Sequence, residues 1–283
     1  MAKKSMRTFV IFGLLVAVLG SCARPRSTPD IRYPCEWPGS PGFTGNIDKV
    51  GVVQPSGICF HPARKTLFVV SDEGEILEMR TDGTAVFSQK VPGDLEDVTV
   101  DPRTGLLYVV VEGEDVILEF DPDKRAVTRR FAVNRAFQGD PNFLQKQMDR
   151  YDNGIESLVF VPDDGHPEGG TFYAGNQEDP PCIMELFVPL RTGGKDGSEA
   201  RILRVLPFKM DDPSGLAYDP LKKRLYAVSD ADNIFVEITL EGKLVGEYAF
   251  PGNDQEGFAW DDEGYLYITQ DSGGIIKLKD LRR

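Results

Sequence analysis

The sequence predicts an all-β fold, a single closed β-propeller. Three observations predict it: a high density of glycine and proline, a repeated order of short β-rich runs, and a repeat length near that of a propeller blade. The 29 glycines and 20 prolines make up about one residue in six, against roughly one in eight on average. Such a density of chain-breaking residues favours many short strands joined by turns over long helices.

Five stretches of the chain share one frame. They begin at Pro55, Leu95, Ile155, Pro213 and Gln255. A β-rich run such as Leu-Tyr-Val-Val at 107–110 or Leu-Tyr-Ala-Val at 225–228 follows the start of each stretch, and a third run comes after it. Turn sequences such as Asp-Glu-Gly at 72–74 and 262–264 separate these runs. Each repeat is therefore expected to form one blade.

The spacing of the repeats supports this interpretation. From Ser56 to Glu96 is 40 residues and from Ser214 to Glu256 is 42, within the roughly 40 to 45 residues of a four-stranded blade. The two longer intervals imply insertions, for which residues 134–154 and 191–200 are the candidates. We count five blades, and a sixth within the insertions stays open.

The last repeat ends after its third strand, so its fourth strand must come from elsewhere. Residues 47–50 lie 40 positions before the fourth strand of the first blade, at 87–90. The sequence therefore predicts that the N-terminal strand at 47–50 completes the last blade. Closure of this kind protects the strand edges that an open array of sheets would expose.

The N-terminal residues predict export and lipid attachment. Lys3, Lys4 and Arg7 precede an apolar run at 9–19, which is shorter than the roughly 20 residues of a membrane span. The run ends in Leu-Gly-Ser-Cys at 19–22, which resembles a bacterial lipobox and marks Cys22 as the lipidated residue. The expected location is the cell membrane or the outer membrane, on the periplasmic or extracellular face, and the resemblance of Ala23 to Gram-negative sorting signals implies the outer membrane. The domains expected are a signal peptide at 1–21, a proline-rich tether at 22–44 and a propeller at 45–283.

The net charge excludes one class of binding partner, and the cysteines suggest one disulfide. A net charge of −13 and a pI near 4.7 argue against nucleic acid as a partner. The oxidising exterior permits a disulfide, for which Cys35 with Cys182 is the expected pair, while Cys59 is expected to be a buried thiol. His61 and His166 both lie in turn-like sequence and are interpreted as turn residues.

Several segments resemble the SdiA-regulated family of bacterial propeller lipoproteins over roughly residues 45–283. The segments are Gly-Asp-Leu-Glu at 93–96, Asn-Gly-Ile-Glu at 153–156, Gln-Glu-Gly-Phe at 255–258, Ser-Gly-Leu-Ala-Tyr-Asp at 214–219 and Val-Ser-Asp-Glu-Gly at 70–74. The resemblance implies a calcium ion in the central channel and no established reaction.

The residues themselves point to the same kind of ion. Glu96, Glu156 and Glu256 occupy one repeat position in three blades, with Ser56 and Ser214 in the other two. In a propeller this position lies near one mouth of the channel, so the three carboxylates are expected to converge. Oxygen ligands without histidine or cysteine suit Ca²⁺. Solvated or backbone-bonded glutamates are the alternative.

A second repeat position follows the second strand of each blade and is also acidic. It is occupied by Asp72, Glu112, Gln177, Asp230 and Asp271. The acids among them are interpreted as hairpin-turn residues, and a place in the same channel mouth or at its rim is the alternative.

Two functions remain open from the sequence. The first is a lipid-anchored, non-enzymatic envelope protein that binds a small molecule or an envelope partner, with Ca²⁺ in its channel. The second is a Ca²⁺-dependent hydrolase of a lactone, phosphoester or similar small ester. The sequence contains neither a Gly-x-Ser-x-Gly elbow nor a P-loop. A free carboxylate facing an open pocket would favour the enzyme, and a channel plugged by side chains would favour the binding protein.

Overall fold

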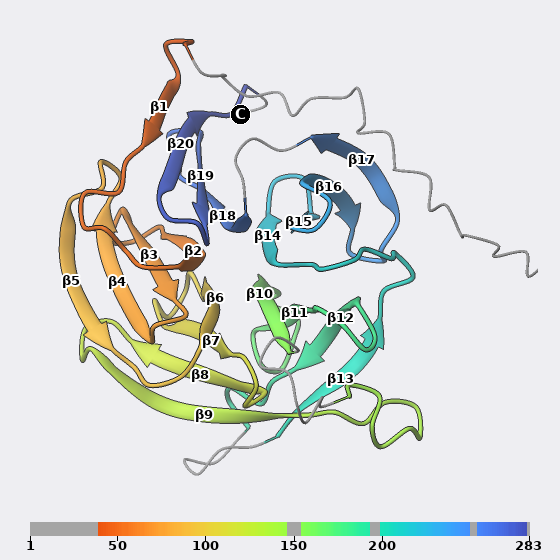
Figure 1. The fold of residues 1–283 in the computed structure, drawn as a ribbon. Helices are drawn as coiled ribbons and strands as arrows, with labels where there is room; N and C mark the ends of the chain where they lie inside the picture. The colour runs from red at the N-terminus through yellow and green to blue at the C-terminus, as the bar shows by residue number, and fades with distance from the viewer. Residues whose placement is uncertain (1–38, 146–153, 193–198, 250–253, 282–283) are drawn as a thin grey trace, which may run out of the picture.

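The computed structural model describes residues 39–145, 154–192, 199–249 and 254–281. In this part of the chain the regular elements are β-strands, arranged as antiparallel blades around a central axis (Figure 1). Three blades are separate four-stranded sheets, and one eight-stranded sheet divides into two further blades. The prediction of a five-bladed propeller is therefore confirmed, and the described residues contain no sixth blade.

The strands follow one another outward from the axis in each blade. Blade 1 contains β2 (Pro55–His61), β3 (Thr66–Ser71), β4 (Glu75–Arg80) and β5 (Ala85–Lys90). Blade 2 contains β6 (Leu95–Val100), β7 (Leu107–Val111), β8 (Val116–Asp121) and β9 (Ala126–Asn134). Blade 3 contains β10 (Ile155–Pro162), β11 (Gly170–Asn176), β12 (Cys182–Phe187) and β13 (Ala200–Val205). Blade 4 contains β14 (Gly215–Asp219), β15 (Arg224–Ser229), β16 (Ile234–Thr239) and β17 (Leu244–Ala249). Blade 5 contains β18 (Gln255–Trp260), β19 (Tyr265–Gln270), β20 (Ile275–Lys279) and β1 (Phe43–Asn46).

The hydrophobic core lies between the blades. Five clusters of buried side chains each combine residues of two adjacent blades, and the cluster between blades 5 and 1 closes the ring. A strand covered on both faces by neighbouring blades needs a continuous apolar run. The second strands provide it, each with a fully buried aromatic ring at the same position: Phe68, Tyr108, Tyr173, Tyr226 and Tyr267. The outer strand β9 instead alternates between exposed and covered residues.

The strand that closes the ring lies earlier in the chain than predicted. β1 pairs antiparallel with β20 through Phe43 and Asn46, opposite Leu278 and Ile276. The prediction that residues 47–50 form the closing strand is therefore wrong, although the prediction that the N-terminal segment closes the ring is confirmed. The reason is the side chain of Asp48, which accepts hydrogen bonds from the backbone N–H groups of residues 50, 51 and 52 at 2.8 to 3.0 Å. These bonds turn the chain away from the sheet.

Blades 2 and 3 are joined at the periphery. Their outer strands β9 and β13 pair in parallel, with Ala200 opposite Val133 and Arg201 opposite Asn134. The two insertions expected from the repeat spacing begin or end at this contact. Parts of both, residues 146–153 and 193–198, lie outside the described residues.

The innermost strands of neighbouring blades approach so closely that the motif requires glycine. A Cβ atom on Gly215 would lie 2.1 Å from the carbonyl oxygen of Glu256, and one on Gly257 would lie 2.7 Å from that of Ser56. Both distances are shorter than any normal contact. The Ser-Gly and Glu-Gly pairs of the repeat are therefore explained by packing around the axis.

Asp97 closes the channel at mid-height. An innermost strand has one edge without a strand partner, so its backbone N–H groups need other acceptors. The buried Asp97 carboxylate accepts hydrogen bonds from the N–H groups of Val98 at 2.7 Å and of Leu158, in blade 3, at 2.8 Å. A further backbone N–H bond comes from Leu216 in blade 4. One side chain thereby ties three blades together across the axis.

Candidate functional site

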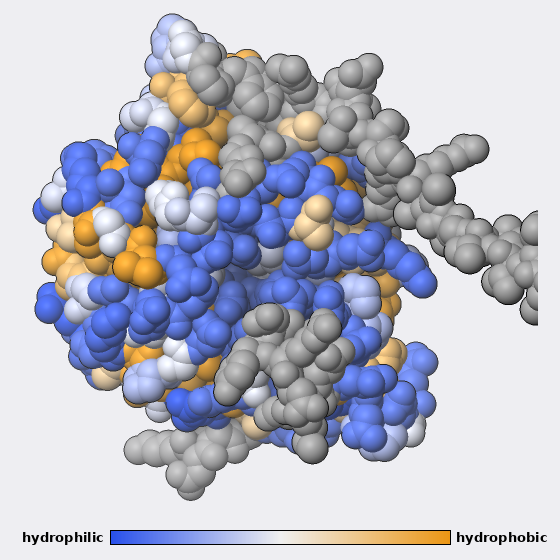
Figure 2. Space-filling view, viewed as in Figure 1, coloured by the Kyte–Doolittle hydropathy of each residue, from blue (hydrophilic) through white to orange (hydrophobic). Residues whose placement is uncertain are grey.

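The starts of the innermost strands surround one mouth of the channel, which we call the acidic mouth. Glu96, Glu156 and Glu256 are the second residues of β6, β10 and β18, as the repeat frame predicted. Each glutamate is mostly buried, and Glu96 and Glu256 interact electrostatically with each other and with Glu156. The face shown in Figure 2 has a hollowed, hydrophilic centre.

The residues after the second strands reach the same mouth. The backbone N–H groups of Asp72, Glu112 and Asp271 donate to carbonyl oxygens of the residues just before the innermost strands, at 3.3, 2.9 and 2.9 Å. The Asp72 carboxylate also accepts a hydrogen bond from the Ser56 hydroxyl. The interpretation as turn acids explains where these residues stand in the hairpins. The alternative, a place at the channel mouth, also applies, because Asp72, Asp230 and Asp271 contribute to the electrostatic field around the glutamates.

A third set of acids was missed by the sequence reasoning. Asp94, Asp212 and Asp254 each lie two positions before the anchor Glu or Ser of their repeat. Asp212 bonds the Glu156 side chain and repels its charge, and Asp94 repels that of Glu96. The recurrence of aspartate at one offset in three of the five repeats was the signal that could have revealed them.

Burial and mutual repulsion raise the pKa values of the three glutamates. Desolvation is the largest cause for each, followed by neighbouring carboxylates. The pKa of Glu256 rises to about 9, and that of Asp72, which also loses solvent, rises to about 6. For Glu96 and Glu156 the pKa lies well above the usual value. Without a cation, the glutamates are therefore held in the protonated form near neutral pH.

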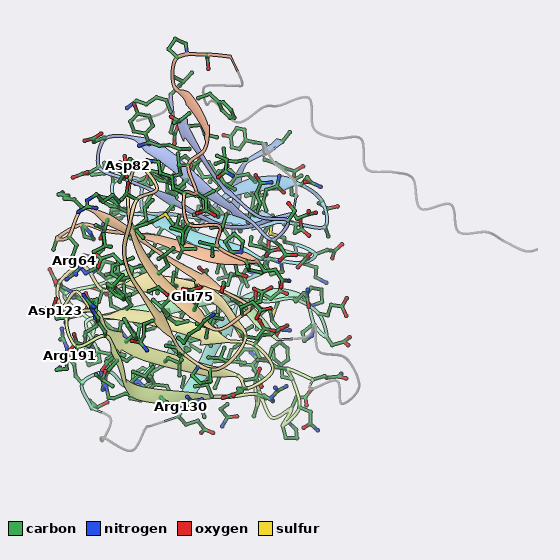
Figure 3. The ribbon with its side chains drawn as sticks, turned by 60° about the vertical axis from the view of Figure 1, so that its left-hand side comes forward. Arg64, Glu75, Asp82, Asp123, Arg130 and Arg191 are labelled. Atoms are coloured by element: carbon green, nitrogen blue, oxygen red, sulfur yellow. The ribbon has the colours of Figure 1, made fainter. Side chains whose placement is uncertain are left out.

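The basic side chains are engaged elsewhere. Arg64 pairs with Glu78 at 2.9 Å and with Asp123 at 2.7 Å at the outer part of the ring, where Figure 3 shows Arg64 and Asp123 close together. Arg129 and Arg204 are also paired with glutamates within their own blades. Among the described residues, no ion pair involves the three mouth glutamates. Protonation or an added cation must therefore neutralise them.

The arrangement fits a hard divalent cation. Asp72, Asp94 and Glu96 each offer a carboxylate oxygen, and these atoms lie within 4.8 Å of one another. Ligand oxygens at 2.3 to 2.6 Å from a Ca²⁺ ion can stand up to about 5 Å apart. Glu156 and Glu256 do not belong to this group, so the structure divides the predicted set of three. The Glu156 Oε2 atom is buried without a hydrogen-bond partner among the described residues, which leaves a ligand oxygen unused.

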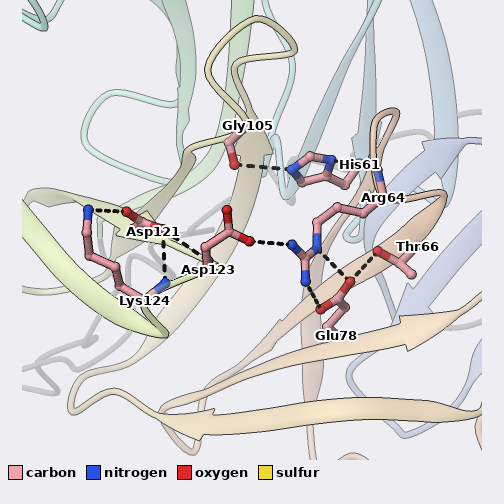
Figure 4. A network of polar contacts seen from close by, with 8 residues as sticks. All are labelled: His61, Arg64, Thr66, Glu78, Gly105, Asp121, Asp123 and Lys124. Atoms are coloured by element: carbon pink, nitrogen blue, oxygen red, sulfur yellow. Dashed lines mark hydrogen bonds and ion pairs between the residues drawn. The ribbon is translucent and has the colours of Figure 1, made fainter.

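The histidines hold turns, as the sequence interpretation expected. His61, at the end of β2, lies 3.1 Å through its Nε2 from the carbonyl oxygen of Gly105 in blade 2 (Figure 4). Burial lowers its pKa. His166 accepts a backbone hydrogen bond from Glu168 at 3.2 Å within its own loop. Neither ring lines the acidic mouth.

The cysteines differ from expectation in one respect. Cys59 is a buried thiol, as predicted, and burial raises its pKa. Cys182 is also a buried free thiol, with its pKa raised to about 12 by burial. The expected disulfide between Cys182 and Cys35 is therefore not formed in this structure, because Cys182 is enclosed at the start of β12. Cys35 itself, like Cys22, lies outside the described residues.

Fold and site together define the class of protein: a five-bladed β-propeller with one carboxylate-lined mouth. The model of the SdiA-regulated family matches residues 41–273. The chain belongs to the SdiA-regulated family, which confirms the resemblance found in the motifs.

Two solved structures are similar to the chain. Myxococcus xanthus glutaminyl cyclase matches with a TM-score of 0.60 and 11% identity, over 88% of this chain and 97% of that one. This likeness extends to the fold alone. Kuenenia stuttgartiensis hydrazine synthase matches with a TM-score of 0.45 and 16% identity, over 83% of this chain and 58% of that one. Within the described residues, no helix has the length and hydropathy needed to cross a membrane.

Proposed function

We propose that this protein is a lipid-anchored propeller of the cell envelope that binds a ligand or an envelope partner without catalysing a reaction, and that it holds Ca²⁺ at the acidic mouth. The observation that carries the calcium proposal is the buried, unpartnered Oε2 atom of Glu156 among carboxylates that no described base neutralises. Burying such a group without compensation costs free energy. A bound cation compensates it.

The residues that would hold the ion come from two sides of the mouth. Asp72, Asp94 and Glu96 form the closest set, and Glu156 and Glu256 interact electrostatically with Glu96. Calcium accepts six to eight oxygen ligands, so backbone carbonyls and water complete such a site. Bound there, the ion neutralises the carboxylates and offers positions to oxygen atoms of a ligand.

The non-enzymatic proposal is supported by the form of the channel. Asp97 ties three blades together across the axis at mid-height, so a substrate entering the acidic mouth would meet a closed floor. The two histidines are engaged in turns away from the mouth.

Glu156→Gln tests the calcium site. In the wild type we expect Ca²⁺ to raise the melting temperature over that of the chelated protein, because an ion bound only to the folded state stabilises it by about 2.7 kcal/mol at a hundredfold excess over Kd. The variant should lose most of this shift, since it removes charge at nearly constant shape. The matched control is Glu247→Gln on the outer strand β17, which should respond like the wild type. A calcium response equal in all three proteins, or absent from the wild type, would refute the site in calorimetry.

Cys22→Ala tests the anchor. Lipid attachment requires the cysteine thiol, so we expect the variant to remain an unprocessed precursor and to take up no labelled fatty acid. Ser21→Ala keeps a small residue before Cys22 and serves as the control, with normal processing. The prediction concerns residues outside the described part of the structure and rests on the lipobox sequence. Labelling of the Cys22→Ala protein at the wild-type level would contradict it.

A further inference from the structure

A second feature of the channel lies at the mouth opposite the acidic one. A cavity of about 340 Å³ opens there, lined by residues of all five innermost strands and by the prolines that follow four of them. The lining begins beyond the level of Asp97, with Val98 in blade 2, its equivalents in blades 1, 4 and 5, and Val159 in blade 3. The cavity is therefore separate from the carboxylates discussed above.

The lining is apolar and largely aromatic. The sixth residue of each repeat frame contributes to it, and these residues are Phe60, Val100, Phe160, Tyr218 and Trp260. Four of the five are aromatic rings, contributed by four different blades. Small residues between them, Ala217 and Ala259, leave the space open. Each of these five side chains lines the cavity and also packs in the core between two blades.

The polar atoms of this lining are engaged by the protein itself. The Trp260 indole N–H donates to Asp280 at 2.8 Å, and the Thr99 hydroxyl accepts the backbone N–H of Phe160 at 3.0 Å. Asp261 accepts the Tyr267 hydroxyl at 2.8 Å, and Asp262 is paired with Lys65. Tyr218 is partly exposed, and its hydroxyl has no hydrogen-bond partner among the described residues, so it can bond a ligand. A charged ligand would find no free counter-charge in the lining.

We propose that this cavity binds a small, uncharged ring compound of about two fused or linked rings, with one hydrogen-bonding group directed at the Tyr218 hydroxyl. Ligand cavities begin at about 300 Å³, and a cavity of about 150 Å³ holds one benzene. The available volume therefore fits two rings. Aromatic faces on several sides favour a flat apolar ligand. The proposal does not depend on calcium, because the acidic mouth lies on the other side of Asp97.

Trp260 provides a direct readout of binding. The chain has two tryptophans, Trp37 and Trp260, so Trp37→Phe leaves a single one in the cavity wall. The probe is N-phenyl-1-naphthylamine, a neutral two-part aromatic compound that accepts excitation energy from tryptophan. With the full chain we expect saturable energy transfer and a Kd below about 100 µM.

Comparison of Val100→Phe with Val86→Phe distinguishes binding of the probe in the cavity from non-specific binding to the protein surface. Val100 is the smallest member of the ring, so a phenylalanine there should fill the space and weaken binding at least about tenfold. Val86 carries the same change on the outer strand β5, where its side chain is 41% exposed, and binding should stay within twofold of wild type.

A third variant keeps the proposal testable if Val100→Phe fails to fold. Tyr218→Phe keeps the ring and removes the hydroxyl, so it should weaken displacement of the probe by 2-naphthol about threefold or more and leave displacement by naphthalene unchanged. Equal probe binding by folded Val100→Phe and Val86→Phe would overturn the proposal, as would no saturable transfer in the wild type. A third outcome would also overturn the proposal: the wild type self-associates but does not bind the probe, and Val100→Phe abolishes the self-association. The aromatic lining would then be a contact between copies of the protein.

Discussion

Deleting residues 23–46 should destabilise the propeller far more than deleting residues 23–38. The longer deletion removes β1, whose partner β20 would then become an open edge. It removes the hydrogen bond from the Lys279 N–H to the Gly42 carbonyl at 3.0 Å, and the bond from the Ile275 N–H to the Asn46 side chain at 3.0 Å. It also removes Phe43, which packs against the cluster between blades 4 and 5.

The expected loss is about 4 kcal/mol or more. Burial of a phenylalanine contributes about 2 kcal/mol, and each lost hydrogen bond contributes about 1 kcal/mol. For a domain of this size, that loss corresponds to a fall in melting temperature of roughly 10 °C. The exposed edge of β20 should also promote aggregation.

The shorter deletion is the control, because it leaves every described residue in place. Its melting temperature should stay close to that of the full chain. Thermal unfolding and light scattering of the three proteins measure both effects. Equal stability of the two truncated chains would show that β1 does not close the ring.

The second large effect is a fall in stability of the calcium-free protein as the pH rises. The pKa of Glu256 is about 9 in the folded protein, against roughly 4.3 in an unfolded chain. Between these two values the folded state holds a proton that the unfolded state has released. Unfolding then releases protons, so stability must decrease as the pH increases through this window and level off above about pH 9.

The expected slope is about 1.4 kcal/mol per pH unit for each carboxyl that stays protonated on folding. Glu96 and Glu156 add to it, because their pKa values are raised as well. Carboxyls such as Glu78 and Glu119 have lowered pKa values and act in the opposite direction at more acidic pH. Burial raises the pKa of Asp97 as well, so the range from pH 6 to pH 9 reports on the mouth glutamates together with Asp97.

Calorimetry in the presence of a chelator measures the slope. Glu256→Gln should reduce it by about 1.4 kcal/mol per pH unit, because the amide does not titrate, whereas Glu247→Gln should leave it unchanged. Added Ca²⁺ should also flatten it, since a bound cation keeps the carboxylates ionised in the folded state. A stability that rises between pH 6 and pH 9, or a slope identical in both variants, would exclude the buried, protonated glutamates.

The repeat made the blades predictable from the sequence. Strand runs such as that around Tyr108 and Tyr226 recur in one order with one set of turns, so a local pattern was enough to locate them. The closing strand was the exception. Residues 47–50 have the expected sequence separation from the fourth strand of blade 1. However, the Asp48 side chain bonds the backbone that follows it and forms a turn there, so these residues do not form a strand.

The candidate site was predictable in part, for a similar reason. Glu96, Glu156 and Glu256 followed from a shared repeat position, because the frame alone places that position near the axis. Asp94 was overlooked although it lies two residues before Glu96 in the same repeat, whereas Asp212 precedes blade 4 and only the packing of neighbouring blades brings it against Glu156. The grouping of Asp72 with Asp94 and Glu96 likewise joins residues of two blades.

By itself the sequence determined the fold class, five of the blades, the N-terminal origin of the closing strand and the acidic character of one mouth. These depend on periodicity, composition and turn chemistry, which are local. Only the tertiary structure decided how the carboxylates are grouped, that Asp97 divides the channel, and that a ring of aromatic side chains lines the opposite cavity. The reason is physical: distances between side chains of different blades are set by the packing of five interfaces around one axis, and no local pattern contains them.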